Sequence, residues 1–118
     1  MTTRATIESF FDALRKKADW TSYLADDMTF ISATSPFKQV AGKDASLPGL
    51  RRFYSMVSAF EVRDLIVEGD KACALTRYTL QAPNRGPAFQ SDVAEIFTVR
   101  KDKITSFAIY FDTAPYPK

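Results

Sequence analysis

The feature that most constrains this chain is a twelve-residue alternation of side chains over residues 89–100. One face of this stretch consists of Phe89, Ser91, Val93, Glu95, Phe97 and Val99. A period of two residues is typical of a β-strand with one face toward an apolar interior. Glu95 lies in the middle of that face, where a carboxylate has to be paired, hydrogen-bonded, protonated or exposed to a water-filled pocket. The pattern therefore predicts a pocket, without indicating which molecule enters it.

The length and composition indicate one globular domain, which we expect to span residues 1–118. A net charge of +2, from 16 basic and 14 acidic residues, is too small for a nucleic-acid-binding surface. Apolar runs stay below the roughly 18 residues of a membrane span, so we expect no membrane partner. The first residues carry no apolar signal core and Cys73 is the single cysteine, so we expect a cytoplasmic protein.

The amino acids that are absent narrow the chemistry. The sequence contains no histidine, which excludes Ser-His and Cys-His schemes and most zinc and non-haem iron sites. Its four glycines form no phosphate-binding loop. We therefore predict no metal and no cofactor, and any proton transfer would depend on a carboxylate or a tyrosine.

Helical spacing occurs in three segments before residue 61. Thr3 is the expected N-cap of a first helix of about four turns, and Asp19 of a short second one. The third helix is expected to start near Ser46 and Pro48. Its apolar face would comprise Leu47, Leu50, Phe53, Tyr54, Val57 and Phe60. Arg51 and Arg52 form a basic pair on this helix, and a solvated helix face is favoured over an anion site.

Extended segments account for most of the remaining chain. We predict strands over 28–32, 61–67, 71–81 and 89–100, followed by one that contains Phe107, Ile109 and Phe111. Residues 33–46 and 83–87 read as turns and loops, and 114–118 as a Pro-rich tail. The order predicts an α+β domain with helices on one side of a curved sheet. In the 71–81 strand the even-numbered residues would face inward, while Cys73, Leu75 and Thr79 are apolar enough to form a homodimer interface.

Several segments together resemble the NTF2-like superfamily, which includes ketosteroid isomerase, SnoaL-type polyketide cyclases, scytalone dehydratase and nuclear transport factor 2. The matching segments are 9–14, 23–30, 42–44 with 50–54, and the closing hairpin over 97–111. They cover nearly the whole chain, although each motif is loose. The resemblance implies a cystatin-like or NTF2-like cone, in which helices pack on a strongly curved, mostly antiparallel sheet.

The resemblance also aligns three positions with the ketosteroid isomerase site. That family uses a tyrosine on the first helix, an aspartate base at the end of the first strand and a protonated aspartate on the penultimate strand. The matching positions here are Phe10, Ser32 and Glu95. Two of the three groups are replaced, so classical steroid isomerisation is not expected, and what the resemblance implies is a pocket with one acid.

The cone would bring helix and strand faces together around that acid. The expected pocket residues are Phe10, Leu14, Tyr23, Phe30, Ser32, Tyr54, Tyr78, Glu95, Phe97, Phe107, Ile109 and Phe111. Among them, Glu95 and Tyr54 are the candidate catalytic residues. Apolar neighbours are expected to raise the pKa of Glu95, whereas an ion pair with Arg63 or Arg77 would make it a structural residue.

Three functions remain open at this stage. The first is SnoaL-type acid–base chemistry, of the isomerase, cyclase or dehydratase kind, on an apolar or aromatic substrate through Glu95. The second is non-catalytic binding of a small apolar or aromatic ligand without a carboxyl group. The third is a domain that serves only as a dimerisation or scaffold unit.

Overall fold

The computed structural model describes residues 1–33, 38–81 and 86–112. In chain order the elements are α1 (Thr3–Lys16), a 3-10 helix η1 (Trp20–Tyr23), β1 (Leu24–Ser32), β2 (Lys38–Ala41), α2 (Lys43–Ser55), β3 (Val57–Glu68), β4 (Lys71–Leu80), β5 (Phe89–Arg100) and β6 (Lys103–Phe111). Most of the predicted loop at 83–87, and the whole tail at 114–118, fall outside the described residues.

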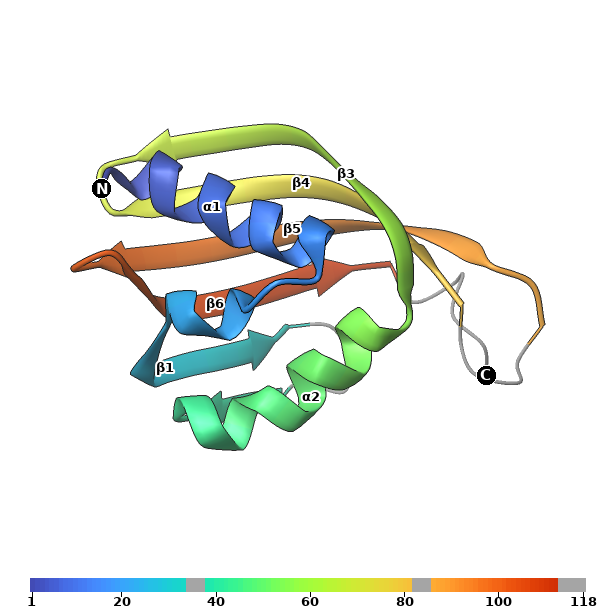
Figure 1. The fold of residues 1–118 in the computed structure, drawn as a ribbon, viewed down its shortest axis with the longest axis horizontal. Helices are drawn as coiled ribbons and strands as arrows, with labels where there is room; N and C mark the ends of the chain where they lie inside the picture. Colours follow the sequence, from blue (N-terminus) through green and yellow to red (C-terminus); the bar gives the residue numbers. More distant parts are fainter. Residues whose placement is uncertain (34–37, 82–85, 113–118) are drawn as a thin grey trace.

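The strands form one sheet in the order β2-β1-β6-β5-β4-β3. Strands β3 to β6 pair antiparallel in sequence order, β2 pairs antiparallel with β1, and β1 joins β6 in parallel. α1 contacts β3, β4 and β5, and α2 contacts β1, β2 and β3. Both helices therefore cover the same side of the curved sheet (Figure 1). The predicted α+β cone with a mostly antiparallel sheet is confirmed.

The first helix begins and ends at recognisable caps. Thr2, one residue before the predicted cap, is the N-cap, and its side chain accepts a 3.0 Å hydrogen bond from the Ala5 amide. Lys17 adopts a left-handed conformation at φ 55°, and its amide donates to the carbonyls of Ala13 and Leu14. Between these caps α1 buries Ile7, Phe10 and Phe11 against the sheet.

The third predicted helix was wrong at both ends. α2 starts at Lys43 after Gly42, whose φ of 95° is a conformation that glycine adopts without strain. It ends at Ser55, and Val57 and Phe60 belong to β3, where Phe60 pairs with Tyr78. The spacing of three residues between Val57 and Phe60 is typical of a helix, but it does not require one. In β3 it results from a register shift between Val57 and Ala59.

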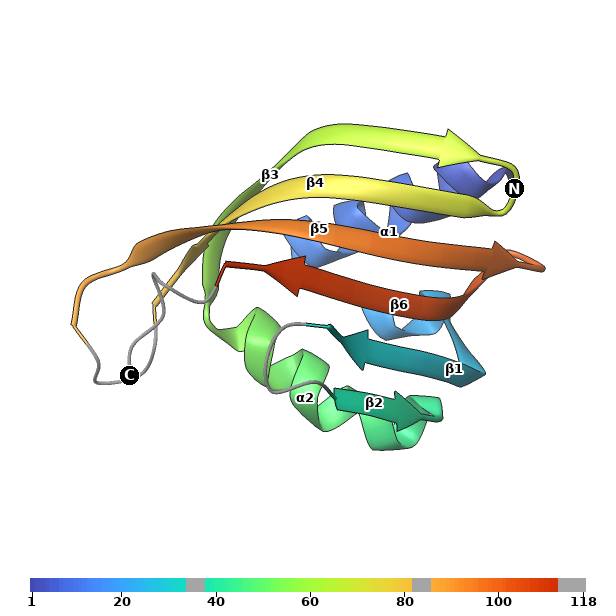
Figure 2. The same cartoon turned by 180° about the vertical axis from the view of Figure 1, so that it is seen from behind.

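β2 was missed, because residues 33–46 were expected to form turns. This four-residue strand lies at the sheet edge and pairs only with β1 among the described strands. Lys38 and Gln39 begin it, and polar residues on a short edge strand give a weak hydrophobic pattern. The strand extends the sheet beyond β1 and lies over α2, as Figure 2 shows.

Phe10 lies at the centre of the core. Its ring is fully buried and packs edge-on against Phe11, Trp20, Phe97 and Phe107, with ring centroids 5.4–6.3 Å apart. The even-numbered residues of β4 all face this core, as predicted, and they are Ala72, Ala74, Thr76, Tyr78 and Leu80. Within the described ranges, neither helix is long and apolar enough to cross a membrane.

Candidate active site at Glu95

Glu95 occupies the centre of β5 on the side of the sheet that the helices cover. It pairs in register with Ala74 of β4 and Ile109 of β6, and only 1% of its surface is exposed. The odd-numbered face of β5 is therefore the interior face, as the alternation predicted. A carboxyl group in this position has lost nearly all its contact with water, and its other contacts decide its charge.

One oxygen of the carboxyl group has a partner and the other does not. The Tyr78 hydroxyl donates a 2.8 Å hydrogen bond to Oε2. Oε1 is buried and has no hydrogen-bond partner among the described residues, and the same holds for Oγ1 of the neighbouring Thr76. A buried oxygen without a partner is costly in a structural carboxylate, and it is a position where a proton, a water molecule or a ligand can bind.

Burial raises the pKa of Glu95 to about 7, because the charged form loses its hydration. The nearby hydroxyls of Thr76 and Tyr78 oppose this rise in pKa. The direction agrees with the expectation from the apolar neighbours in the sequence.

The alternative of a structural ion pair is wrong. Arg77 points to the opposite side of the sheet, where its Nε lies 2.8 Å from Oδ1 of Asp92. Arg63 is likewise paired with another residue, since its Nε lies 3.6 Å from Oε1 of Glu61. Since β-strand side chains alternate between faces, Arg77 next to Tyr78 has to leave the interior.

A second tyrosine extends this buried group toward the helices. Tyr54 of α2 lies beside Tyr78, with the ring centroids 6.5 Å apart. Burial and the charge of Glu95 raise the pKa of both phenols well above their ordinary value. The ring of Trp20 packs against that of Tyr54, with centroids 5.0 Å apart, and the ring of Phe53 packs against that of Tyr78, with centroids 5.2 Å apart. Residues from α2, β4 and β5 thus form one buried cluster of Tyr54, Tyr78 and Glu95, in which Tyr78 and Glu95 are hydrogen-bonded.

Glu95 borders a small cavity of about 20 Å³ under α2. The lining residues are Phe30, Gly49, Leu50, Phe53, Tyr54, Val93, Glu95, Phe107 and Ile109. About 10–15 Å³ is needed to hold one water molecule, so this cavity has the size of a single water. A larger molecule reaches Glu95 only if one of these side chains moves.

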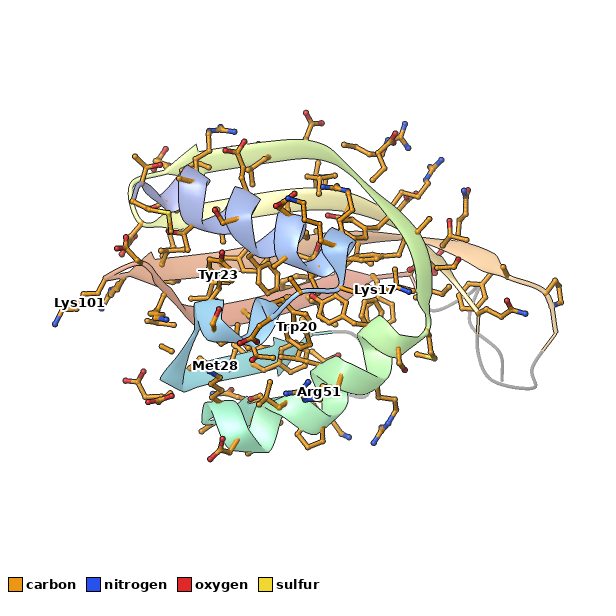
Figure 3. All side chains as sticks on the ribbon, in the orientation of Figure 1. Lys17, Trp20, Tyr23, Met28, Arg51 and Lys101 are labelled. Carbon is orange, nitrogen blue, oxygen red and sulfur yellow. The ribbon has the colours of Figure 1, made fainter. Side chains whose placement is uncertain are left out.

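A much larger groove lies on the other side of Tyr54. It has a volume of about 630 Å³, within the usual range of small-molecule sites. It is lined by Leu14, Arg15, Lys17, Ala18, Trp20, Arg51, Tyr54, Ser55, Val57, Ser58, Ala59 and Phe60. Lys17, Trp20 and Arg51 mark it in Figure 3, in the space between α1 and α2. Tyr54 lines both spaces, so it separates the open groove from the cavity at Glu95.

The structure divides the predicted pocket residues into separate groups. Glu95, Tyr54, Phe30, Phe107 and Ile109 meet at the cavity, and Leu14 lines the groove. Tyr78 contributes through its hydrogen bond to Glu95.

The other predicted pocket residues line neither space. Phe10 and Phe97 are fully buried core residues, and Tyr23 packs against the same core. Phe111 packs beside Tyr78 and Val93, and Ser32 ends β1 next to Ile109. Phe10 and Ser32, the aligned isomerase positions, thus lie outside the cavity at Glu95.

Most groove residues were not predicted from the sequence. The groove is formed by the C-terminal ends of α1 and α2, by residues 17–20 after α1, and by the first residues of β3. These segments are far apart in the sequence. The sequence pattern also places Val57 and Phe60 in the third helix, so it does not indicate that they line a groove. Within the described ranges no group of three or more acidic or cysteine side chains could hold a metal ion.

The comparisons with known proteins agree on the fold. The profile of the SnoaL-like domain matches residues 7–107. No curated protein matches the sequence significantly.

Several solved structures resemble the whole chain. An NTF2-like protein from Burkholderia thailandensis has a TM-score of 0.83 at 18% identity, covering 98% of this chain and 94% of that one. A candidate SnoaL-like polyketide cyclase from Mesorhizobium loti has a TM-score of 0.77 at 22% identity, covering 93% and 99%. A candidate ketosteroid isomerase from Kribbella flavida has a TM-score of 0.78 at 18% identity, covering 98% and 82%. At these identities the likeness establishes the fold alone.

Proposed function

Because this chain belongs to the SnoaL-like domain family, we propose that it binds a small apolar or aromatic molecule and performs acid–base chemistry on it with Glu95. One observation carries the proposal. Glu95 is a buried carboxyl group with a pKa near neutrality, one oxygen bonded to Tyr78 and the other without a partner beside a cavity. A pure scaffold gains nothing from such a group, because a buried acid with an unsatisfied oxygen destabilises the fold.

The pKa suits proton transfer in both directions. A catalytic acid or base is most effective when its pKa lies close to the working pH, and that of Glu95 is about 7. For this transfer the Tyr78 hydroxyl has to turn from Oε2 of Glu95 toward Tyr54. Protonated Glu95 then passes its proton to Tyr78, as Tyr78 passes its own to Tyr54 and Tyr54 donates its own to a carbonyl or enolate oxygen of a molecule in the groove, in one concerted step. The ionised form accepts a proton along the reverse path.

Tyr54 is therefore the group that contacts the substrate, and Glu95 is the proton reservoir behind it. This division explains why an acid buried under α2 can still serve a molecule in the open groove. The reactions that such a path supports are isomerisation, cyclisation or dehydration next to a carbonyl group, since each needs one oxygen to be protonated or stabilised.

A second candidate function is non-catalytic binding of the same kind of ligand. The observation in its favour is that Glu95 is the sole carboxylate lining the cavity or the groove, among the described residues. A reaction that moves a proton between two positions commonly uses an acid and a base, and Ser32 replaces the aspartate base of the enzymes that the chain resembles.

Exchange of α-protons in a simple ketone distinguishes the two functions. With 2-tetralone in heavy water, followed by NMR, we expect the protein to accelerate exchange over buffer and E95Q and Y54F to reduce the enzymic rate by about 10²-fold. E8Q, on the exposed face of α1, and Y23F, outside both spaces, are the matched controls and should keep the wild-type rate. Saturable ketone binding without exchange would establish the binding function and overturn the catalytic one.

We also propose a homodimer formed through the outer face of the sheet. Figure 2 shows this face, with the described helices behind it. Ile66, Leu75, Ile96 and Tyr110 are exposed large apolar residues there. The strand register places Ile96 next to Cys73, and Cys73 next to Ile66, so the exposed residues adjoin one another across strands. Adjoining exposed apolar side chains usually mark an interface. We further propose that the protein acts in the cytoplasm, where Cys73 stays reduced.

A further inference from the structure

We infer that the ligand of the groove between α1 and α2 is an anion: a small apolar or aromatic carboxylate, recognised by Arg15, Lys17 and Arg51. This inference rests on the proposed function, in that a small molecule enters the groove, and it goes further by naming the chemical class. It differs from the expectation of a ligand without a carboxyl group, because the groove residues include three cations.

The charge of the groove is the first reason to expect an anion. Its twelve lining residues include three cations and no carboxylate. Within the described part of the chain, none of the three cations has an ion-pair partner, whereas the adjacent Lys16 lies 3.0 Å from Asp12. Concave surfaces lined by a single sign of charge concentrate counter-ions, and here the counter-ion has to be an anion.

The positions of the two arginines are the second reason. The guanidinium carbon of Arg15 lies 4.8 Å from the ring centroid of Phe60, and that of Arg51 lies 5.8 Å from Trp20. Both rings line the groove. Stacking on an aromatic face holds a guanidinium group in place and leaves its N–H donors available in the plane. Two guanidinium groups at the wall of one groove suit a carboxylate, because each can donate a pair of N–H hydrogen bonds to its two oxygens.

The ends of the helices do not account for these cations. α1 and α2 both end at the groove, and basic residues near a helix C-terminus are common because they offset its partial negative charge. However, Lys16 and Arg52, the sequence neighbours of Arg15 and Arg51, also lie near these helix ends, and they do not line the groove. Each helix end contributes about half a negative charge, so three full positive charges leave the groove clearly positive.

The remaining lining defines the other end of the ligand. Leu14, Trp20, Val57 and Phe60 offer apolar and aromatic contact, and Tyr54 lies between the groove and the cavity that Glu95 lines. A molecule with a carboxylate against Arg51 can therefore place a hydrocarbon or aromatic portion against these side chains and a reacting group at Tyr54. The groove volume of about 630 Å³ accommodates such a molecule.

The test uses 3-phenylpropanoate and its uncharged analogue 3-phenylpropanamide as probes of nearly equal shape. Trp20 is the single tryptophan of the chain and lines the groove, so its fluorescence reports binding without a label. We expect the carboxylate to bind saturably and the amide to bind at least about tenfold more weakly. We also expect added salt to weaken the carboxylate alone, because exposed charges are screened.

Two pairs of neighbouring residues provide matched variants. R51A and R15A remove cations of the groove, whereas R52A and K16A remove equal charges from the same helix turns outside it. We expect R51A and R15A each to weaken carboxylate binding by about two- to fivefold, the range of a partly exposed ion pair. R52A and K16A should match the wild type. Calorimetry serves as the second measurement, since R51A also changes the surroundings of Trp20.

The outcomes separate this inference from the function on which it rests. Equal binding of acid and amide, or equal losses in R51A and R52A, overturns the anion assignment and leaves the role of Glu95 standing. Ketone exchange that is lost in E95Q supports that role whatever the charge of the ligand. If neither probe binds saturably, the groove is not the ligand site and the anion assignment falls.

Discussion

The hydroxyl of Tyr78 donates a 2.8 Å hydrogen bond to Oε2 of Glu95, although the two residues are not cross-strand partners. Tyr78 pairs in register with Ser91, and Glu95 with Ala74. Both side chains point to the covered side of the sheet, and the long phenol reaches along the strands to the carboxyl group. Burial raises the pKa of Glu95 to about 7, and the hydroxyls of Thr76 and Tyr78 act in the opposite direction.

Glu95 should make the protein less stable at higher pH. Its pKa is about 7 in the folded protein and 4.5 in the absence of burial, so between these values the folded state keeps a proton that the unfolded chain has lost. Raising the pH through this window therefore favours unfolding, by an amount on the order of 3 kcal/mol when complete. Denaturant unfolding of the wild type and E95Q from about pH 4 to pH 8 measures the effect.

The comparison with E95Q isolates this contribution. Asp19 and Asp92 have lowered pKa values, so they stabilise the fold at higher pH, and they do so equally in both proteins. The wild type should lose stability relative to E95Q as the pH rises. A difference in unfolding free energy that stays constant over this range would show that Glu95 does not titrate there.

Removing the Tyr78 hydroxyl should raise the pKa of Glu95 above its wild-type value. In Y78F, Oε2 loses the donor that stabilises the ionised carboxylate, while the burial stays nearly the same. Carboxyl NMR of Glu95 in the two proteins measures the shift, with Y23F as a control of equal chemistry outside the hydrogen-bonded path. An unchanged pKa in Y78F would mean that the hydrogen bond does not act on the charged form.

The faces of β4 and β5 could be predicted because they depend on local alternation, whereas β2 was missed and β1 starts at Leu24 rather than at Met28. A period of two residues alone predicts that Glu95 and Phe97 lie on the interior face, and the packing of β5 agrees. The end of α2 could not be predicted, since Val57 and Phe60 continue the helical spacing and only pairing with β4 draws them into a strand. Long-range pairing therefore overrode a local pattern.

The candidate site was predicted in part for the same reason. The acid was visible, because a carboxylate inside an apolar pattern is conspicuous. Its link to Tyr54 depends on how α2 crosses the sheet, and the groove depends on two helix ends that meet only in the folded chain. The sequence favours a solvated helix face for both Arg51 and Arg52. In the folded chain, Arg51 lines the groove and Arg52 does not.

Phe10 should behave as a core residue rather than as part of the ligand site. It is fully buried among four aromatic rings and lines neither the cavity nor the groove. F10A should lower the free energy of unfolding by about 3–5 kcal/mol, and F10L by much less, because leucine fills most of the space. Urea denaturation measures both. Loss of ligand binding in a stably folded F10L would instead assign Phe10 to the site.

Ile96 should control the proposed association of two copies through the outer face. Its side chain is 40% exposed in the middle of β5, with Cys73 on one side and Ala108 on the other. Sedimentation of the wild type at micromolar concentration should show a dimer. I96K places a charge within the apolar face and should yield a folded monomer, because burying an unpaired ammonium group costs more than the contact returns. As a control, E8K introduces a lysine at an exposed position of α1, and this variant should remain dimeric. A wild type that sediments as a monomer rules out this interface, and a dimeric I96K locates it elsewhere.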